Sequence, residues 1–415
     1  MNYTKSHTIK FSITIAFLLT SQFVHTTGQL KPKTISVTDM TLPEKIGQLM
    51  MVHFHGIEAN AEAYKLVQDI SIGGMIYYNW ANSLTTPEQV QKLSIGLQQL
   101  TKATRLQIPL LIAADQEGGR VARCPGTKFP GNQALGLTNH PELAEASALV
   151  IGTELAAMGV NTNLAPVIDI NSNPLNPVIG SRSFGDTPDI VTTFGAQALQ
   201  GYHAAGIITT LKHFPGHGDT NTDSHLDLPV VNKSLQELQV TELYPFAQLA
   251  HQTDLIMTAH ILVPALDPDY CTTISRKTIN YLRHELGFNG VIITDSLVMA
   301  GILKQVDQSV AEAAIQALIA GHDIILLGGA QLHGTSITRE LTLTDLLQIH
   351  QAIILAVQSG IIPEAQINQS VQRILKLKAK YLDQQPTQTN NLGDQVNTSE
   401  HQALALQISK AVTRT

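Results

Sequence analysis

The sequence predicts an α/β protein built as a closed (β/α)8 barrel of the TIM type. Eight short apolar segments alternate with segments of helical periodicity, which is typical of βα units. The apolar segments are nearly continuous, as expected for parallel strands that are buried on both faces. Polar residues follow directly after six of them, where barrel enzymes build their sites. A doubly wound open sheet is the alternative, but its usual GxGxxG turn is absent.

The predicted elements follow one another along the chain in regular order. The strands are short and apolar, and they are Leu49–Phe54, Gly73–Tyr78, Pro109–Ala114, Asn163–Ile170, Ile207–Leu211, Leu255–Ala259, Val291–Thr294 and Ile324–Leu327. Helical spacing is clearest in Pro141–Met158, Leu235–His251, Lys277–Leu286, Ser309–Ala320 and Leu343–Val357. Pro363–Leu382 is predicted to be a closing helix, with lysines near its C-terminal end.

Composition indicates a globular protein with a large core. Of 415 residues, 43% are hydrophobic and 14% are charged, which argues against disorder. The formal net charge of −7 makes a nucleic-acid surface improbable on physical grounds. Cys124 and Cys271 are the two cysteines, and their spacing leaves open whether they pair. Neither a CxxC motif nor a His/Cys zinc spacing occurs.

Residues 1–29 contain a basic, an apolar and a small-residue segment in the order that a secretory signal has. Lys5 and Lys10 precede the uncharged run Phe11–Val24, and small residues follow at 26–28. The run is shorter than the roughly 20 residues that span a bilayer, so a cleaved signal is favoured over an anchor. We therefore expect residues 1–29 to be a signal peptide, 30–385 a single catalytic barrel, and 386–415 a polar linker with a short helical tail. Export to the periplasm or the medium of a bacterium follows.

Two motifs supply charged groups suited to gripping a ligand. In DQEGGRVAR, Asp115 ends a buried strand and two glycines permit a tight turn; Arg120 and Arg123 either neutralise Asp115 or face a ligand. In a loop stiffened by prolines after strand four, Arg182 is presented from NPVIGSRSFG. A carboxylate binds sugar hydroxyls bidentately, so we favour a ligand-facing role for Asp115.

Two further motifs supply a nucleophile and a proton donor. Asp295 in TDSLVM directly follows a buried strand, where a carboxylate is either functional or the N-cap of the next helix. In LKHFPGHGDTNTDSHLDLP, Asp223 lies two residues from His225, so it can fix the tautomer of the imidazole and raise its basicity. A nucleophile facing an acid/base suits double displacement at an acetal carbon.

These motifs resemble glycoside hydrolase family 3, in its β-N-acetylglucosaminidase branch. MTLPEKIGQLMMV, DQEGGRVAR, NPVIGSRSFG, KHFPGHGDTNTDSH and TDSLVM occur in the family's order, and the likeness covers Met40–Tyr381. Two positions depart from the branch: Cys124 follows Arg123, and strand two ends in YYNWANS without the usual Arg, although Trp80 offers a stacking face.

The resemblance implies roles for eight residues. It makes Asp295 the nucleophile, His225 the general acid/base and Asp223 its partner, and it assigns the terminal N-acetylglucosamine to Asp115, Arg123, Arg182, Lys212 and His213. The implied reaction is retaining hydrolysis of terminal β-linked N-acetylhexosamine from peptidoglycan fragments or chitooligosaccharides. The resemblance implies a carbohydrate substrate and neither a metal nor an organic cofactor. The net charge predicts no nucleic-acid partner, and the short apolar run predicts no stable membrane insertion after signal cleavage.

Three alternatives stay open. A metal-dependent barrel hydrolase would use His213, His217 and His225 with Asp295. A phosphorylase would use the same site, because a neutral base does not repel phosphate as a carboxylate would. A sugar-binding protein without catalysis would hold N-acetylglucosamine and release nothing.

Overall fold

The computed structural model of the chain describes residues 35–333, 336–382 and 391–412. The predicted signal segment, residues 1–29, and the part of the predicted polar linker up to residue 390 lie outside the described residues. No helix in the described ranges has the length and apolar content needed to cross a membrane. Cys124 and Cys271 are both buried and free, so they do not pair with each other.

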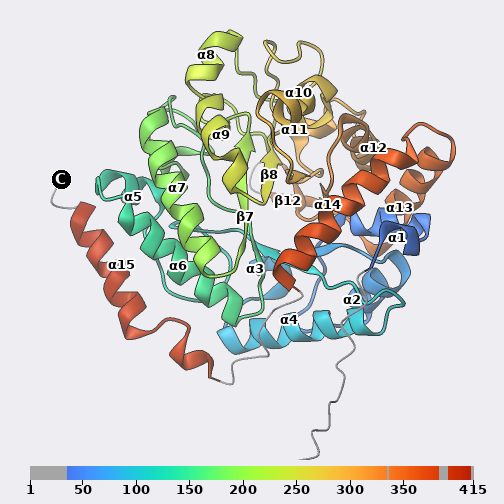
Figure 1. Cartoon of the computed structure of the whole chain (residues 1–415), viewed down its shortest axis with the longest axis horizontal. Helices are drawn as coiled ribbons and strands as arrows, with labels where there is room; N and C mark the ends of the chain where they lie inside the picture. The colour runs from blue at the N-terminus through green and yellow to red at the C-terminus, as the bar shows by residue number, and fades with distance from the viewer. Residues whose placement is uncertain (1–34, 334–335, 383–390, 413–415) are drawn as a thin grey trace, which may run out of the picture. The chain divides into compact units, whose positions relative to one another are not determined.

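Eight parallel strands form a closed barrel, which confirms the predicted α/β fold. The sheet runs in the order β10-β1-β2-β3-β6-β7-β8-β9, and a parallel bridge between Ile293 and Ile324 closes it. Helices surround the central strands (Figure 1). The strands are β1 (Met50–Val52), β2 (Gly74–Ile76), β3 (Leu111–Ala114), β6 (Thr162–Asn163), β7 (Ile208–Phe214), β8 (Leu255–Thr258), β9 (Val291–Thr294) and β10 (Ile325–Leu326).

The surrounding helices begin at the caps that the sequence offers. Thr41, Ser234 and Thr342 each form a capping box with an acidic residue three positions later, which satisfies backbone donors at the helix start. The longer helices are α1 (Leu42–Gln48), α4 (Pro87–Lys102), α6 (Glu142–Ala157), α7 (Pro188–Ala204), α12 (Val310–Ala320), α13 (Leu343–Gln358) and α14 (Glu364–Leu382).

Two of the predicted elements are interrupted in the structure, and a proline explains each interruption. The predicted helix Leu235–His251 is divided into α8 (Leu235–Val240) and α9 (Leu243–Leu249). Pro245 has no N–H to donate to the carbonyl of Thr241, whose backbone leaves the helical region at φ −122° and ψ −104°. The predicted strand Asn163–Ile170 is regular only over β6, because Pro166 cannot continue the ladder of hydrogen bonds; Val167 forms a single bridge to Lys212.

The predicted tail helix packs on the barrel. α15 (Ser399–Val412) lies against α5 (Asn132–Leu137) and α6, as Figure 1 shows at the edge of the domain. Ile408 on this helix is fully buried. The buried Glu154 of α6 accepts hydrogen bonds from His401 Nδ1 and from the Asn397 amide, each at 2.8 Å.

Two hairpins rise from the carboxyl end of the barrel. β4 (Gln116–Gly118) and β5 (Val121–Ala122) follow β3, and β11 (Ala330–His333) and β12 (Ser336–Glu340) follow β10. Gly118 and Gly119 adopt positive φ angles of 88° and 58°, and the tight β4–β5 turn requires them. The strand ends and these hairpins together enclose the site described next.

Candidate active site

A pocket of about 570 Å³ opens at the carboxyl end of the barrel. Its volume suits a small ligand. All eight residues that the sequence singled out line it, namely Asp115, Arg123, Arg182, Lys212, His213, Asp223, His225 and Asp295. The structure therefore brings together residues that lie up to 180 positions apart in the chain, from Asp115 to Asp295.

Lys212 is the centre of a buried charge network at the end of β7. Its Nζ lies 2.6 Å from Oδ1 of Asp115 and 2.8 Å from Oε1 of Glu117. Lys212 and Glu117 side chains are each about 2% exposed, so each charge requires its partner. Asp115 is 18% exposed and is the member that reaches the pocket.

Arg182 joins the same network from the loop after β6. Its guanidinium donates two parallel hydrogen bonds to Glu117, from Nε at 2.9 Å and from Nη2 at 2.8 Å. Such a bidentate pair fixes the plane of the guanidinium. Burial acts to raise the pKa of Glu117, but Arg182 and Lys212 beside it hold that pKa well below its usual range. Glu117 is thus an anion that sets the position of two cations.

His213 is oriented by a buried carboxylate. Asp169 accepts from Nδ1 of His213 at 2.7 Å and from the amides of His213 and His217 at 3.1 and 2.7 Å. Because Nδ1 carries the proton, Nε2 accepts from Arg182 at 3.3 Å. The register of β7 shifts between Leu211 and Phe214, which explains how the adjacent Lys212 and His213 both face the pocket.

Asp295 follows β9 and is an ionised carboxylate on the pocket wall. Its Oδ1 accepts from the amide of Ser296 at 2.7 Å. Burial acts to raise its pKa, but the imidazoles of His213, His260 and His225 lower the pKa to about 2. The predicted alternative, an N-cap role, is wrong, because the next helix begins at Ala300 with Met299 as its N-cap.

His260 holds the turn that carries Asp295. Its Nε2 donates to the carbonyl of Ser296 at 2.8 Å, and its Nδ1 lies 2.7 Å from the hydroxyl of Thr273. Burial lowers the pKa of His260, so the ring is neutral and serves as a support. The Ser296 hydroxyl donates to the Gly328 carbonyl, which ties the turn to β10 as well.

Asp223 and His225 form the predicted dyad on the loop of residues 215–229. Oδ1 of Asp223 accepts from Nδ1 of His225 at 2.8 Å and from its amide at 2.9 Å. Nε2 of His225 is therefore the nitrogen that faces the pocket. Burial acts to lower the pKa of His225, but the bonded Asp223 and then Asp295 raise the pKa above its usual value. No hydrogen bond or ion pair joins His225 to Asp295 in the described residues.

The dyad loop is tied down at its base. Both ring nitrogens of His217 lie 2.9 Å from hydroxyls, Nδ1 from Thr220 and Nε2 from Ser224. The Ser224 carbonyl accepts from the Gly301 amide at 3.0 Å. Because both nitrogens of His217 are occupied, the geometry does not favour a metal site made of His213, His217 and His225 with Asp295.

The two arginines of the DQEGGRVAR motif do not neutralise Asp115, contrary to one prediction. Lys212 does so instead. Arg120 donates to the carbonyls of Val178 and Ile179, and so it stiffens the loop that carries Arg182. Arg123 lines the pocket, and its buried Nε has no hydrogen-bond partner within the described part of the chain. A polar ligand or an ordered water satisfies such a group.

An aromatic wall faces the charged residues. Tyr78 and Trp80 stack with ring centroids 5.2 Å apart and an interplanar angle of 19°. Both line the pocket, and Trp80 is 40% exposed. The predicted stacking face of Trp80 is therefore accessible from the pocket.

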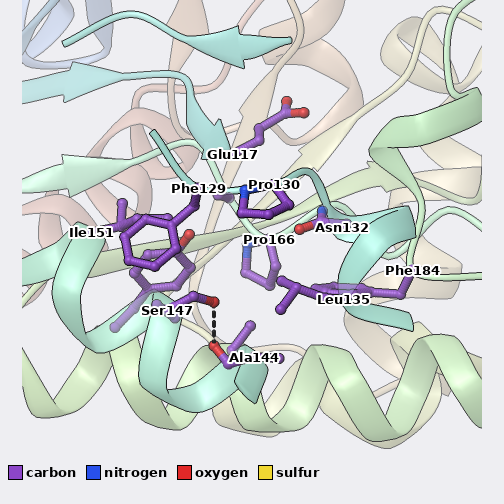
Figure 2. Close-up of a pocket in the computed structure, with 14 residues that line it drawn as sticks. Glu117, Phe129, Pro130, Asn132, Leu135, Ala144, Ser147, Ile151, Pro166 and Phe184 are labelled. Atoms are coloured by element: carbon purple, nitrogen blue, oxygen red, sulfur yellow. Dashed lines mark hydrogen bonds between the residues drawn. The ribbon is translucent and has the colours of Figure 1, made fainter. Parts of the chain in front are cut away.

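A second, much smaller cavity lies beneath the charge network. Phe129, Pro130 and Ala144 are among the residues that line its volume of about 10 Å³, which is room for no more than one water. Figure 2 shows the carboxylate of Glu117 directed away from this cavity. The cavity is a packing gap under the site.

The chain matches the glycosyl hydrolase family 3 N-terminal domain over residues 41–377. The chain belongs to glycosyl hydrolase family 3. Among solved structures, a family 3 beta-N-acetylglucosaminidase from Paenibacillus sp. str. FPU-7 is 42% identical with a TM-score of 0.83, over 90% of this chain and 69% of that one. A beta-N-acetylhexosaminidase from Beutenbergia cavernae is 27% identical with a TM-score of 0.73, over 82% of this chain and 99% of that one.

Two curated proteins are also similar to this chain, and both are named beta-hexosaminidases. Beta-hexosaminidase A of Pseudoalteromonas piscicida is 38% identical over 77% of this chain, and the match covers 55% of that protein. The chain thus spans about half the length of that relative. Beta-hexosaminidase of Pseudomonas aeruginosa is 36% identical over 67% of this chain and 81% of its own length. The family resemblance that the motifs indicated is confirmed.

Glu117 was not predicted as part of the site, and Asp169 was predicted only as one of the polar residues that follow the strands, without a role. Glu117 lies in DQEGG two positions after Asp115, and Asp169 lies in the buried segment VIDI. An acid within a buried run requires a cationic or hydrogen-bonding partner, and this was the available signal. The sequence offered no way to identify Arg182, 65 positions away, as that partner.

Proposed function

We propose that the chain is a retaining exo-glycosidase that removes terminal β-linked N-acetylglucosamine. One observation carries the proposal: an ionised Asp295 and the Asp223–His225 pair line the same pocket. That pocket is also lined by Asp115, Lys212 and Arg182, whose positions are fixed by ion pairs. Relatives named beta-hexosaminidase and beta-N-acetylglucosaminidase support the choice of sugar.

The first half-reaction forms a glycosyl–enzyme ester. A carboxylate oxygen of Asp295 attacks the anomeric carbon, and the bond from that carbon to the leaving oxygen breaks. His225, protonated on Nε2, gives its proton to the leaving oxygen, and Asp223 stabilises the resulting neutral ring through Nδ1. The pKa directions of both groups fit these roles, since Asp295 is ionised and His225 is the more basic.

The second half-reaction uses the same residues in reverse. A water attacks the anomeric carbon, Nε2 of His225 accepts its proton, and the ester bond to Asp295 breaks. Asp115, Lys212, Arg182 and His213 hold the sugar through both steps, and Arg123 receives a sugar oxygen at its unpartnered Nε. No hydrogen bond or ion pair joins His225 to Asp295 within the described residues, and we propose that the dyad loop closes over the bound sugar before proton transfer.

Turnover of a panel of 4-nitrophenyl β-glycosides tests the proposal. A preference for the N-acetylglucosaminide over the glucoside is expected, and the β-anomer is released first. Preference for glucoside contradicts the choice of sugar, initial release of the α-anomer contradicts retention, and binding without release indicates a sugar-binding protein. A sugar 1-phosphate formed only in the presence of phosphate identifies a phosphorylase instead.

We further propose that the enzyme is exported and acts on peptidoglycan fragments or chitooligosaccharides. The basic and apolar order of residues 1–29 supports export. Cell fractionation of a bacterium that expresses the full chain tests this, with activity expected outside the cytoplasm. Activity confined to the cytoplasm contradicts it.

A further inference from the structure

A second cluster of ligand-type side chains lies at the carboxyl ends of the neighbouring strands β1 and β10. His53 and His55 follow β1, and Glu340 ends the β11–β12 hairpin. Nε2 of His55 lies 2.5 Å and Nε2 of His53 lies 3.9 Å from the same Oε2 of Glu340. Within the residues that the structure describes, this is the one group of three such side chains whose ligand atoms all lie within 4.8 Å of one another.

The backbone explains how two of the three groups meet. His53 and His55 follow β1 directly and are two positions apart, which is the spacing at which side chains of an extended chain project to the same side. Phe54 between them is 1% exposed and anchors the segment in the core. The two imidazoles therefore share one side, with ring centroids 5.8 Å apart, and Glu340 approaches them from 285 positions further along the chain.

The donor set selects one class of cation. Two imidazoles and one carboxylate suit zinc and similar borderline divalent ions, whereas calcium and magnesium prefer oxygen alone. Bonds of 2.0–2.2 Å at tetrahedral angles place ligand atoms about 3.4 Å apart. The distances from Oε2 of Glu340 to Nε2 of His53 and to Nε2 of His55, 3.9 and 2.5 Å, lie on either side of that value. A small shift of Glu340 makes the geometry suitable.

The surroundings orient the ligands and leave an entry path. The His53 side chain is 3% exposed, and its ring contacts Trp80 edge-on at 4.9 Å between centroids. The His55 and Glu340 side chains are 54% and 27% exposed, so an ion reaches them from solvent. The Gly329 amide lies 3.4 Å from Nδ1 of His53; when Nε2 binds a cation, the ring proton moves to Nδ1 and this weak bond is lost.

We propose that His53, His55 and Glu340 bind a zinc-class divalent cation. The ion fastens the base of the β11–β12 hairpin to the end of β1. Gly329 and Ala330 at the start of this hairpin line the pocket together with Trp80. The ion therefore fixes the aromatic wall opposite the charged residues, and it takes no part in the acid/base chemistry. An open fourth position holds a water.

Metal binding to the full chain tests the proposal directly. After dialysis against a chelator, equilibrium dialysis with Zn²⁺ should give one ion per chain at this site, and Co²⁺ should give the visible absorption of a four-coordinate complex. His55→Ala and Glu340→Gln should each weaken this binding by more than about 100-fold, because loss of a direct ligand exceeds the effect of losing an outer-shell partner. Zn²⁺ should also raise the Tm of the unmodified chain but not of Glu340→Gln.

Matched variants separate this site from other histidines. His140→Ala is the control, since His140 pairs with Glu142 at 2.8 Å on the surface and should leave Zn²⁺ binding unchanged. His225→Ala tests for an ion held by the pocket, and the site proposed here should persist in it. Binding that survives both His55→Ala and Glu340→Gln, or that disappears in His225→Ala, overturns the proposal. If no ion binds but both variants lower the Tm, the three side chains are held together by hydrogen bonds alone and the proposal is wrong.

Discussion

The two halves of the pocket are built differently. At the strand ends, Glu117 and Lys212 are about 2% exposed and form an ion pair with each other. On the loop, Asp223 and His225 are 27% and 41% exposed and are paired only with each other. A group that holds substrate gains from being fixed in advance, whereas a group that exchanges protons with water needs to reach solvent. The rigid half is thus suited to binding and the loop half to proton transfer.

Loss of Asp295 should have the largest effect. Asp295→Ala removes the carboxylate that forms the ester, so turnover should fall by more than about 10⁴-fold while the fold persists. Steady-state kinetics with a 4-nitrophenyl glycoside measures this, and circular dichroism checks the fold. Residual turnover near that of the unmodified chain would contradict the assignment of Asp295 as the nucleophile.

Loss of His225 should depend on the leaving group. His225→Ala removes the proton donor, which contributes about 10²- to 10⁴-fold. The loss should be large for a natural disaccharide and small in the glycosylation step of an activated aryl glycoside, whose leaving group needs little protonation. Pre-steady-state bursts on both substrates measure this difference. Equal losses would mean that the loop half has no proton-transfer role, and the contrast between the halves would fail.

The fold and much of the pocket could be predicted because both depend on local patterns. Continuous apolar runs identify strands buried on both faces, and the residue after each run lies at the carboxyl end of the barrel. Asp115, Lys212, His213 and Asp295 were found in this way. The interruption at Pro166 and the split helix at Pro245 followed from backbone chemistry that hydrophobic periodicity does not record.

The partners inside the pocket could not be predicted, because they depend on long-range contacts. Glu117 neutralises Arg182 and Lys212 from 65 and 95 positions away, as residue numbers 117, 182 and 212 give. The prediction that Arg120 neutralises Asp115 was wrong for the same reason, since its carbonyl partners at 178 and 179 belong to another loop. His53 and His55 were passed over, because their significance depends on Glu340.

Glu117→Gln should test the rigid half through stability. The variant leaves two buried cations short of an anion, which costs about 3–5 kcal/mol in the free energy of unfolding. Urea unfolding measures it, and Glu142→Gln on the surface should change little. Because the folded-state pKa of Glu117 is depressed, its contribution is fully present above a pH of about 4.3, declines below that value, and is lost as the pH falls through the folded-state pKa. The gap between the two proteins should therefore narrow in acid.

Asp223→Asn should produce the smallest change, a shift of a pH profile. Asp223 raises the pKa of His225, so its removal should lower that pKa and move the alkaline limb of kcat/KM to lower pH. The acidic limb should stay in place, because the Asp295 pKa of about 2 depends on His213 and His260 as well as on His225. A profile of kcat/KM against pH for both proteins measures the two limbs separately. If both limbs of the kcat/KM profile move together, His225 and Asp295 titrate as one unit. The division of the pocket into a proton-transfer half and a binding half would then be wrong.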